Sequence, residues 1–151
     1  MINATDRKIL RILQQDGRIT NHELASRCAL SPSACLERTR RLRERGYIRS
    51  FAALLDPVLL DQALLVFVEV VLERTTADVF EKFSDAVREK PEILECHMVA
   101  GGFDYLLKLR MADMERYRNF LVDTLAQLPG VRETRTYAVM EEVKNSVALA
   151  I

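Results

Sequence analysis

Residues 30–46 read LSPSACLERTRRLRERG, and this stretch predicts the helix around which the N-terminal part of the chain is organised. Ser31 suits an N-cap, because its hydroxyl can accept a hydrogen bond from a first-turn backbone N–H. Pro32 follows at the first helical position, where its missing N–H costs nothing. Gly46 supplies the left-handed backbone with which many helices end. The stretch therefore carries both a start signal and a stop signal for one helix.

This helix is expected to have a buried side and a basic side. Leu36, Thr39 and Leu42 recur every three residues, so we expect them to share the face that points into a core. Arginine suits forked contacts with phosphate and with the O6/N7 edge of guanine. On a helix taken alone, a solvated basic face is the simpler interpretation. The residues expected on the outer face are Ala34, Glu37, Arg38, Arg41 and Arg45.

The segment before this helix favours DNA binding. Thr20 and Glu23 have the spacing of a capping box, which opens a short helix over residues 21–28. Residues 29–31 then form a tight turn into the arginine-rich helix. Two short helices joined by such a turn, the second of them basic, are typical of the helix-turn-helix, whose second helix enters the major groove.

A further helix and an extended segment are expected to flank this pair. Thr5 or Asp6 would cap the first helix of the chain, and Gly17 would end it. Residues 47–55 are apolar and partly alternating, so we expect a short strand or wing there. The N-terminal part would then be a three-helix, winged helix-turn-helix unit.

Charge separates the two halves of the chain, although the net charge of all 151 residues is zero. Residues 1–50 hold 11 Lys and Arg against 5 Asp and Glu, a net charge of +6. The remaining residues, with 11 bases and 17 acids, carry −6. Such an asymmetry indicates that one half meets a polyanion and the other does not.

The second half predicts a βαββαβ order, the ferredoxin-like split pattern, and thus an α+β chain. If both helices cover one face of the sheet, its other face is bare, and we expect a second copy to cover it, sheet against sheet. The expected domains are a helix-turn-helix domain at 1–50, a linker at 51–62 and a ferredoxin-like domain at 63–151. The expected elements are a strand at 64–72, a helix capped by Thr76 with Val79, Phe80, Phe83, Ala86 and Val87 inward, strands at 93–100 and 104–111 around the turn 101–103, a helix capped by Asp113 with Met114, Tyr117, Leu121, Leu125 and Leu128 inward, and a strand at 131–143.

Several function classes are disfavoured by the sequence. No apolar run approaches the roughly 18 residues of a membrane span, and the N-terminus lacks a signal sequence, so a cytoplasmic location is expected. Cys28, Cys35 and Cys96 are odd in number and fit reduced, partly buried thiols better than a disulfide framework. No metal-ligand spacing, nucleophile–base pair or phosphate loop is present, so we expect no metal site and no enzyme.

Three motifs in this order closely resemble the Lrp/AsnC family of bacterial and archaeal transcription regulators, and in particular its leucine-responsive branch. They are LSPSACLERTRRL at residues 30–42, G-x-x-D-Y at 101–105 and MEEVK at 140–144. The resemblance extends from about residue 4 to the C-terminus.

The resemblance implies a regulator of amino-acid metabolism genes that binds double-stranded DNA, together with a C-terminal effector and oligomerisation domain of the RAM, or ACT-like, type. It implies dimers that assemble into octamers, as tetramers of dimers, or into hexadecamers, with DNA wrapped around them in the nucleoid. No cofactor is implied. The effector would be an amino acid, with leucine or another small amino acid expected.

The DNA-contacting residues are expected to lie on the arginine-rich helix. Those expected to face base edges are Ser33, Ala34, Glu37, Arg38 and Arg41, and those expected to contact phosphates are Arg40, Arg43 and Arg45. Ala34 stands where the family commonly has proline. Simple solvation of Arg43 and Arg45 is the alternative.

The effector is expected at the hairpin turn Gly101, Gly102 and Phe103, together with Asp104 and Tyr105. Glycines let the backbone approach a small ligand and offer N–H donors to a carboxylate, and an ionised Asp104 could accept from an α-ammonium group. The alternative is a plain hairpin turn. Gly102 stands where the family turn often carries an acid, so one candidate partner for an amino group is missing. The resemblance adds Met114, Tyr137 and Val139 to the same site.

One different function remains open from the sequence. The chain could be an architectural protein that coats DNA with little sequence preference and responds to no effector. A ligand-binding oligomer without DNA is disfavoured by the arginine-rich helix, and a catalyst by the absence of catalytic motifs.

Overall fold

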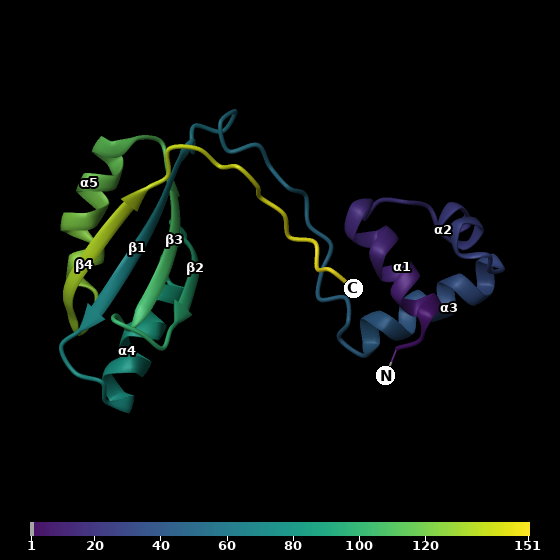
Figure 1. Cartoon of the computed structure of the whole chain (residues 1–151), viewed down its shortest axis with the longest axis horizontal. Coiled ribbons are helices and arrows are strands. Elements are labelled where there is room, and N and C mark those ends of the chain that lie inside the picture. The colour runs from purple at the N-terminus through teal and green to yellow at the C-terminus, as the bar shows by residue number, and fades with distance from the viewer. Residues whose placement is uncertain (1) are drawn as a thin grey trace. The chain divides into compact units, whose positions relative to one another are not determined.

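The computed structural model describes residues 2–151, which form two units (Figure 1). The first unit runs to Leu54 and also contains Lys144–Ile151, and the second is Leu55–Val143. We expected residues 63–151 to form one domain, but the last part of the chain returns to the first unit. There the Gln14 side-chain amide donates to the Leu149 carbonyl oxygen at 3.1 Å and accepts from the Leu149 N–H at 2.6 Å. The C-terminal segment is thus held on the first helix.

The first unit contains α1 (Ala4–Gln15), α2 (Asn21–Cys28) and α3 (Pro32–Glu44). The predicted caps of the last two helices are confirmed. Thr20 Oγ1 accepts from the Glu23 N–H at 3.2 Å, and Ser31 Oγ accepts from the Ala34 N–H at 3.2 Å. The first helix begins earlier than predicted, because Asn3 Oδ1 accepts from the Asp6 N–H at 2.8 Å and so makes Asn3 the cap.

The buried stripe of α3 differs from the prediction at one position, where Cys35 takes the place of Leu36, while Leu42 is buried as predicted. Cys35 is fully buried and Leu42 is 3% exposed, whereas Leu36, expected in the core, is 60% exposed. Cys35 and Leu42 lie seven residues apart, so they project from the same side of the helix. Burial raises the pKa of the Cys35 thiol, as it does that of Cys28. All three cysteines are free.

The strand or wing expected at residues 47–55 is not formed, because this segment has no strand partner. The Tyr47 and Ile48 amides instead donate to the carbonyl oxygen of Leu42, at 2.9 and 3.4 Å, and close the end of α3. Beyond them the chain is extended, and turns follow at residues 57–61.

The second unit confirms the predicted βαββαβ order and the α+β fold class. Its sheet is antiparallel with strand order β2-β3-β1-β4, so the two inner strands are β1 and β3. In Figure 1 the two helices lie on the same side of the sheet. The elements are β1 (Leu64–Leu72), α4 (Ala77–Arg88), β2 (Ile93–Met98), β3 (Tyr105–Met111), α5 (Met114–Asp123), the 3₁₀ turn η1 (Leu125–Gln127) and β4 (Val131–Ala138).

The core of this unit lies between the sheet and its two helices. Along β1, Val66, Val68 and Val70 are fully buried, while the alternate residues Phe67 and Glu69 lie on the other, helix-free face. That face also carries polar pairs, among them the Lys108–Glu95 and Arg110–Glu142 ion pairs at 2.9 and 2.7 Å. It is therefore a mixed apolar and charged surface.

Two expectations for the last elements are wrong. Met114, expected inward, is 52% exposed at the start of α5, and Phe120 is buried in addition to Tyr117. The last strand ends at Ala138 rather than continuing to residue 143, because the chain there leaves the sheet. Val139 makes the last contact with β1, where its N–H donates to the Leu65 carbonyl oxygen at 2.9 Å.

Gly130 gives a direct test of this packing. Its φ is +74°, and a Cβ added there would lie 2.6 Å from Val79 Cγ1 on α4. We expect Gly130→Ala to lower the free energy of unfolding by about 2 kcal/mol, from left-handed strain and the clash with α4. Urea denaturation would measure the loss. Gly101→Ala is the matched control, since an added Cβ there meets nothing within 4 Å. Equal losses in both variants would contradict the packing described.

Candidate DNA-contacting helix and effector hollow

The side of α3 that faces away from Cys35 and Leu42 is the candidate DNA-contacting surface. The choice of buried residues described above determines which side chains this surface exposes. In the N-terminal half of α3, where a recognition helix meets base edges, this side carries Leu36 in addition to predicted residues. The exposed side chains are Ser33, Ala34, Leu36, Glu37, Arg40, Arg41, Arg43 and Arg45.

Arg38 does not belong to this exposed surface. Its Nη1 donates to Asp6 Oδ1 of α1 at 2.8 Å, and 32% of the Arg38 side chain and 19% of the Asp6 side chain are exposed. The guanidinium therefore ties α3 to α1, rather than pointing outward as we expected. The periodicity of α3 could not show this, because Asp6 lies 32 residues away in the sequence.

Arg40 is held between two carboxylates on the exposed side. Its Nη2 donates to Glu37 at 2.8 Å, and its Nη1 donates to Glu44 at 2.6 Å. The hydrogen bond from Arg40 holds the pKa of Glu37 below its usual range, so Glu37 is ionised at neutral pH. Both carboxylate oxygens of Glu37 accept from Arg40, beside the base-facing positions.

Three arginines remain available for phosphate. Arg41, Arg43 and Arg45 are exposed, and within residues 2–151 no side-chain hydrogen bond or ion pair engages their guanidinium groups. They lie in the C-terminal half of α3 and at its C-cap. An exposed, unpaired guanidinium suits the positioning contacts that a recognition helix makes with the DNA backbone.

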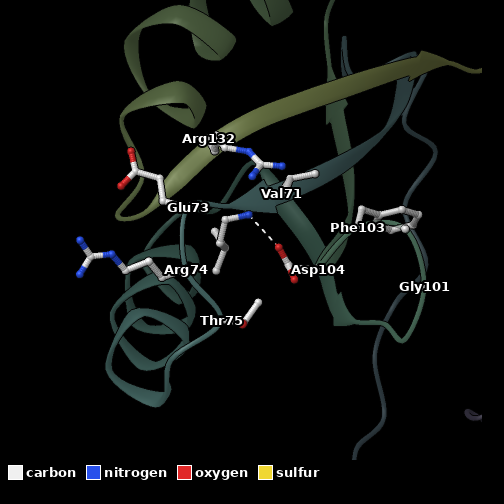
Figure 2. Close-up of a pocket in the computed structure, with 10 residues that line it drawn as sticks. Val71, Glu73, Arg74, Thr75, Gly101, Phe103, Asp104 and Arg132 are labelled. Atoms are coloured by element: carbon white, nitrogen blue, oxygen red, sulfur yellow. Dashed lines mark hydrogen bonds between the residues drawn. The ribbon is translucent and has the colours of Figure 1, made fainter.

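The second candidate site is an open hollow of about 290 Å³ at one end of the sheet (Figure 2). It combines the end of β1 with the hairpin turn between β2 and β3. Four predicted effector residues line it, namely Gly101, Gly102, Phe103 and Asp104. The other lining residues are Val71, Leu72, Glu73, Arg74, Thr75 and Arg132.

Asp104 is a structural anchor of this hollow as well as a candidate ligand. Its Oδ2 accepts from the Leu72 N–H at 2.7 Å, the contact drawn as a dashed line in Figure 2. Its own N–H donates to the Val70 carbonyl oxygen at 3.0 Å. One carboxylate oxygen is therefore occupied by β1, and the other is available to a bound group.

Arg132 is a residue of the hollow that the sequence interpretation missed. Val71 pairs with Glu133 and Leu72 pairs with Val131, so Arg132 is the extra residue of a β-bulge in β4. Bulges redirect side chains and are over-represented beside functional sites. In Figure 2 the Arg132 guanidinium extends toward Val71 and the end of β1, while Arg74 points away from the hollow. Within residues 2–151 no side-chain hydrogen bond or ion pair engages Arg132.

Tyr105 does not line the hollow. It is 3% exposed and packs in the core, with its ring centroid 4.6 Å from that of Phe83. Its hydroxyl lies 3.4 Å from Ser84 Oγ on α4. Strand alternation explains the difference, since Tyr105 follows Asp104 directly and so points to the opposite side.

The remaining predicted effector residues lie at the other end of the sheet. Tyr137 pairs with Phe67, Val139 bonds Leu65, and Met114 follows the end of β3, whose Met111 pairs with Leu64. At about 3.3 Å per strand residue, Leu65 and Leu72 are roughly 23 Å apart. One copy of the chain therefore does not bring all the predicted effector residues together.

Tyr137 lies on the helix-free face and makes a contact of its own. Its hydroxyl donates to Glu69 Oε1 at 3.2 Å, and this hydrogen bond raises the pKa of Tyr137. The ring is half-exposed, so Tyr137 is not a core residue.

Comparison with known proteins identifies the family. Residues 65–149 match the model of the Lrp/AsnC ligand-binding domain, and residues 2–49 match a winged helix-turn-helix DNA-binding model. The chain belongs to the Lrp/AsnC family. The resemblance seen in the sequence is thereby confirmed, and the chain is a DNA-binding transcription regulator with a C-terminal ligand-binding domain.

Relatives and solved structures agree with this assignment. The leucine-responsive regulatory proteins of Escherichia coli K12 and Klebsiella pneumoniae are each 57% identical over 150 residues, which is 99% of this chain and 92% of each relative. A transcriptional regulator of Neisseria meningitidis, solved as an L-Met complex, is 40% identical with a TM-score of 0.94 over 99% of this chain and 96% of its own. An AsnC family regulator of Agrobacterium tumefaciens is 34% identical with a TM-score of 0.93 over 98% and 96%.

Two further features are absent from the described residues, 2–151. No helix there is both long and apolar enough to cross a membrane. No group of three or more His, Cys, Asp and Glu side chains there is placed to hold a metal ion.

The Arg38–Asp6 pair predicts a stability effect. Arg38→Ala leaves the largely buried Asp6 carboxylate without its partner, so we expect the free energy of unfolding of the first unit to fall by about 1 kcal/mol. Urea denaturation would measure it. Arg43→Ala is the control, because this arginine is exposed and should change stability by less than about 0.5 kcal/mol. In an Asp6→Asn background, Arg38→Ala should cost little more, and equal losses in both backgrounds would contradict a coupled pair.

Proposed function

We propose that this chain regulates amino-acid metabolism genes by sequence-specific DNA binding, and that a small amino acid bound where two copies meet modulates it. It acts by binding and not by catalysis, and it needs no cofactor. The observation that carries the proposal is the division of the candidate effector residues between two ends of one sheet. A second copy could bring Tyr137, Val139 and Met114 beside another copy's hollow.

The hollow has the chemistry of an amino-acid site. The Arg132 guanidinium can bind an α-carboxylate in a forked contact, and the turn formed by Gly101 and Gly102 exposes backbone N–H groups to the same ligand. The free oxygen of Asp104 can accept from an α-ammonium. Because Gly102 provides no acid, Asp104 carries that role with Glu73 at the rim. The ligand would thus be recognised by both of its charged groups.

The identity of the amino acid is suggested by the relatives. Several are named leucine-responsive regulatory proteins, and the Neisseria meningitidis structure contains L-Met. Apolar side chains at the second end of the sheet, the exposed Met114 and the half-buried Val139 among them, would suit the side chain of leucine or another small apolar amino acid. One copy would then bind the α-carboxylate and α-ammonium groups of the ligand, and the other copy would contact the ligand's side chain.

Self-association follows from the helix-free face of the sheet. Phe67, Val71 and Tyr137 lie there among paired charges, and a face of this mixture is typical of contacts between copies of a protein. We propose a dimer formed sheet against sheet and an octamer built as a tetramer of dimers. A dimer also suits a helix-turn-helix, which commonly contacts two half-sites about 34 Å apart.

On the DNA, α3 would lie in the major groove of the duplex. Ser33, Ala34 and Glu37 would face base edges, with Arg40 held beside Glu37. Arg41 and Arg45 would bind phosphates, and Arg38 would support the helix from behind. The protein would accordingly be found in the cytoplasm, associated with the nucleoid. An effector-independent architectural protein is the second candidate, favoured by the openness of the hollow in a single chain.

A ligand screen tests the effector. A ligand that binds only the folded state stabilises it, by about 2.7 kcal/mol at one hundred times its Kd. We therefore expect leucine or another small amino acid to raise the Tm in a thermal-shift screen of all amino acids, and to change the sedimentation profile. Arg132→Ala should remove the shift. Arg118→Ala is the matched control, an exposed arginine on α5 outside the hollow. If no amino acid raises the Tm, the architectural alternative is favoured.

Salt dependence tests the phosphate role of Arg41. Each phosphate neutralised by a cation contributes about 0.9 to the slope of log affinity against log salt for duplex DNA. Arg41→Ala should weaken binding to all duplexes and reduce that slope by about 0.9, or about 1.8 for a dimer with both helices engaged. Arg118→Ala should bind as the unmodified chain does. An unchanged slope with altered sequence preference would show that Arg41 contacts bases instead.

A further inference from the structure

The exposed leucine of α3 has no structural role within the chain. Leu36 is 60% exposed, although the core of the first unit lies directly beneath the same helix and already takes Cys35 and Leu42. A single exposed leucine is ordinary on a protein surface, so its position on α3, and not its exposure, is what points to a binding role. Within residues 2–151 it belongs to neither hydrophobic cluster.

The neighbours of Leu36 place it on the DNA-contacting side. Ser33 lies one turn before it, Arg40 lies one turn after it, and Glu37 is adjacent, all of them exposed. Leu36 also sits in the N-terminal half of α3, the half that faces base edges when a recognition helix enters the groove. It is thus an apolar side chain among polar ones, at the position where bases are contacted.

The charge around Leu36 selects the kind of partner. Residues 1–50 carry a net charge of +6, and the unpaired Arg41, Arg43 and Arg45 follow on the same helix. A surface this basic complements the DNA backbone better than it complements an apolar protein surface. Among the groups that base edges present in the major groove, the C5-methyl of thymine is the apolar one.

We propose that Leu36 contacts a thymine methyl group and makes each half-site prefer an A·T pair of one orientation at that position. The methyl distinguishes T·A from A·T as well as from both G·C orientations, because it lies on one side of the groove. Arg40, clamped between Glu37 and Glu44, cannot swing across Leu36 without losing two ion pairs. The leucine is therefore held open toward the groove, and the preference is for shape and apolarity, with no hydrogen bond involved.

Uracil substitution isolates this contact, because deoxyuridine differs from thymidine only by the missing methyl. Duplexes selected from a random library by the full-length chain would supply the sites, and each thymine would be replaced by deoxyuridine in turn. One replacement should weaken binding about three- to fivefold, the loss expected for one buried methyl group, and replacing the equivalent thymine in both half-sites should weaken it roughly 9- to 25-fold. Leu36→Ala should bind the thymine duplex with the same reduction and be insensitive to that replacement.

Two controls keep the test decisive. Leu94→Ala removes a comparably exposed leucine from β2, at 53% exposure, and should retain the full uracil effect. Leu36→Met keeps an apolar side chain of similar reach and should retain most of it. The proposal is overturned if Leu36→Ala responds to every uracil replacement as the unmodified chain does. It is equally overturned if Leu36→Ala changes the sedimentation profile and leaves the uracil pattern intact, since Leu36 would then contact another copy.

Discussion

The burial of Cys35 and Leu42 against α1 and α2 determines which residues of α3 are exposed and therefore available to contact DNA. A helix has one rotation about its axis that buries a given stripe, and choosing this stripe exposes Ser33, Leu36, Glu37 and Arg40. The Asp6–Arg38 ion pair adds a directional contact on the same inner side, so it opposes rotation of the helix in either direction. A basic helix of the same composition rotated by one residue would present Arg38 and hide Leu36. The DNA-contacting surface is therefore a product of core packing as much as of arginine content.

In the second unit the central position of β1 has a comparable effect. Its inward valines anchor the core, its register fixes β3 and β4 on either side, and its two ends carry the two groups of candidate effector residues. Asp104 is fastened to the Leu72 end by its side chain, and Val139 to the Leu65 end by its backbone. A strand is a rigid spacer, so these groups are kept far apart in one chain. The same rigidity would hold them ready for groups supplied by another copy.

Much of this architecture could be predicted because it depends on local chemistry. Thr20, Ser31 and Asp113 cap the helices as their side chains predict, and the βαββαβ order follows from alternation and helical spacing. The misses depend on tertiary contacts. Two patterns in α3 share Leu42: the spacing of three that starts at Leu36 and the spacing of seven that starts at Cys35. Contacts with the helices that pack against α3 decide that Cys35, and not Leu36, is buried. Arg132 was missed because the bulge that turns it into the hollow appears only once β4 is in register with β1, and Arg38 was misplaced because its partner is distant in sequence.

The openness of the hollow bears on how an effector could act. A ligand shifts an equilibrium only by the difference in its affinity for the two states, and a ligand held by Arg132, Asp104 and a glycine turn alone would contact nothing that differs between assembled and separate copies. If a second copy supplies Tyr137, Val139 and Met114, the assembled state gains contacts that the separate state lacks. Binding and assembly are then linked by necessity, in either direction. The separation of the residues along the sheet is thus the feature that would let an amino acid change how many recognition helices are presented together to DNA.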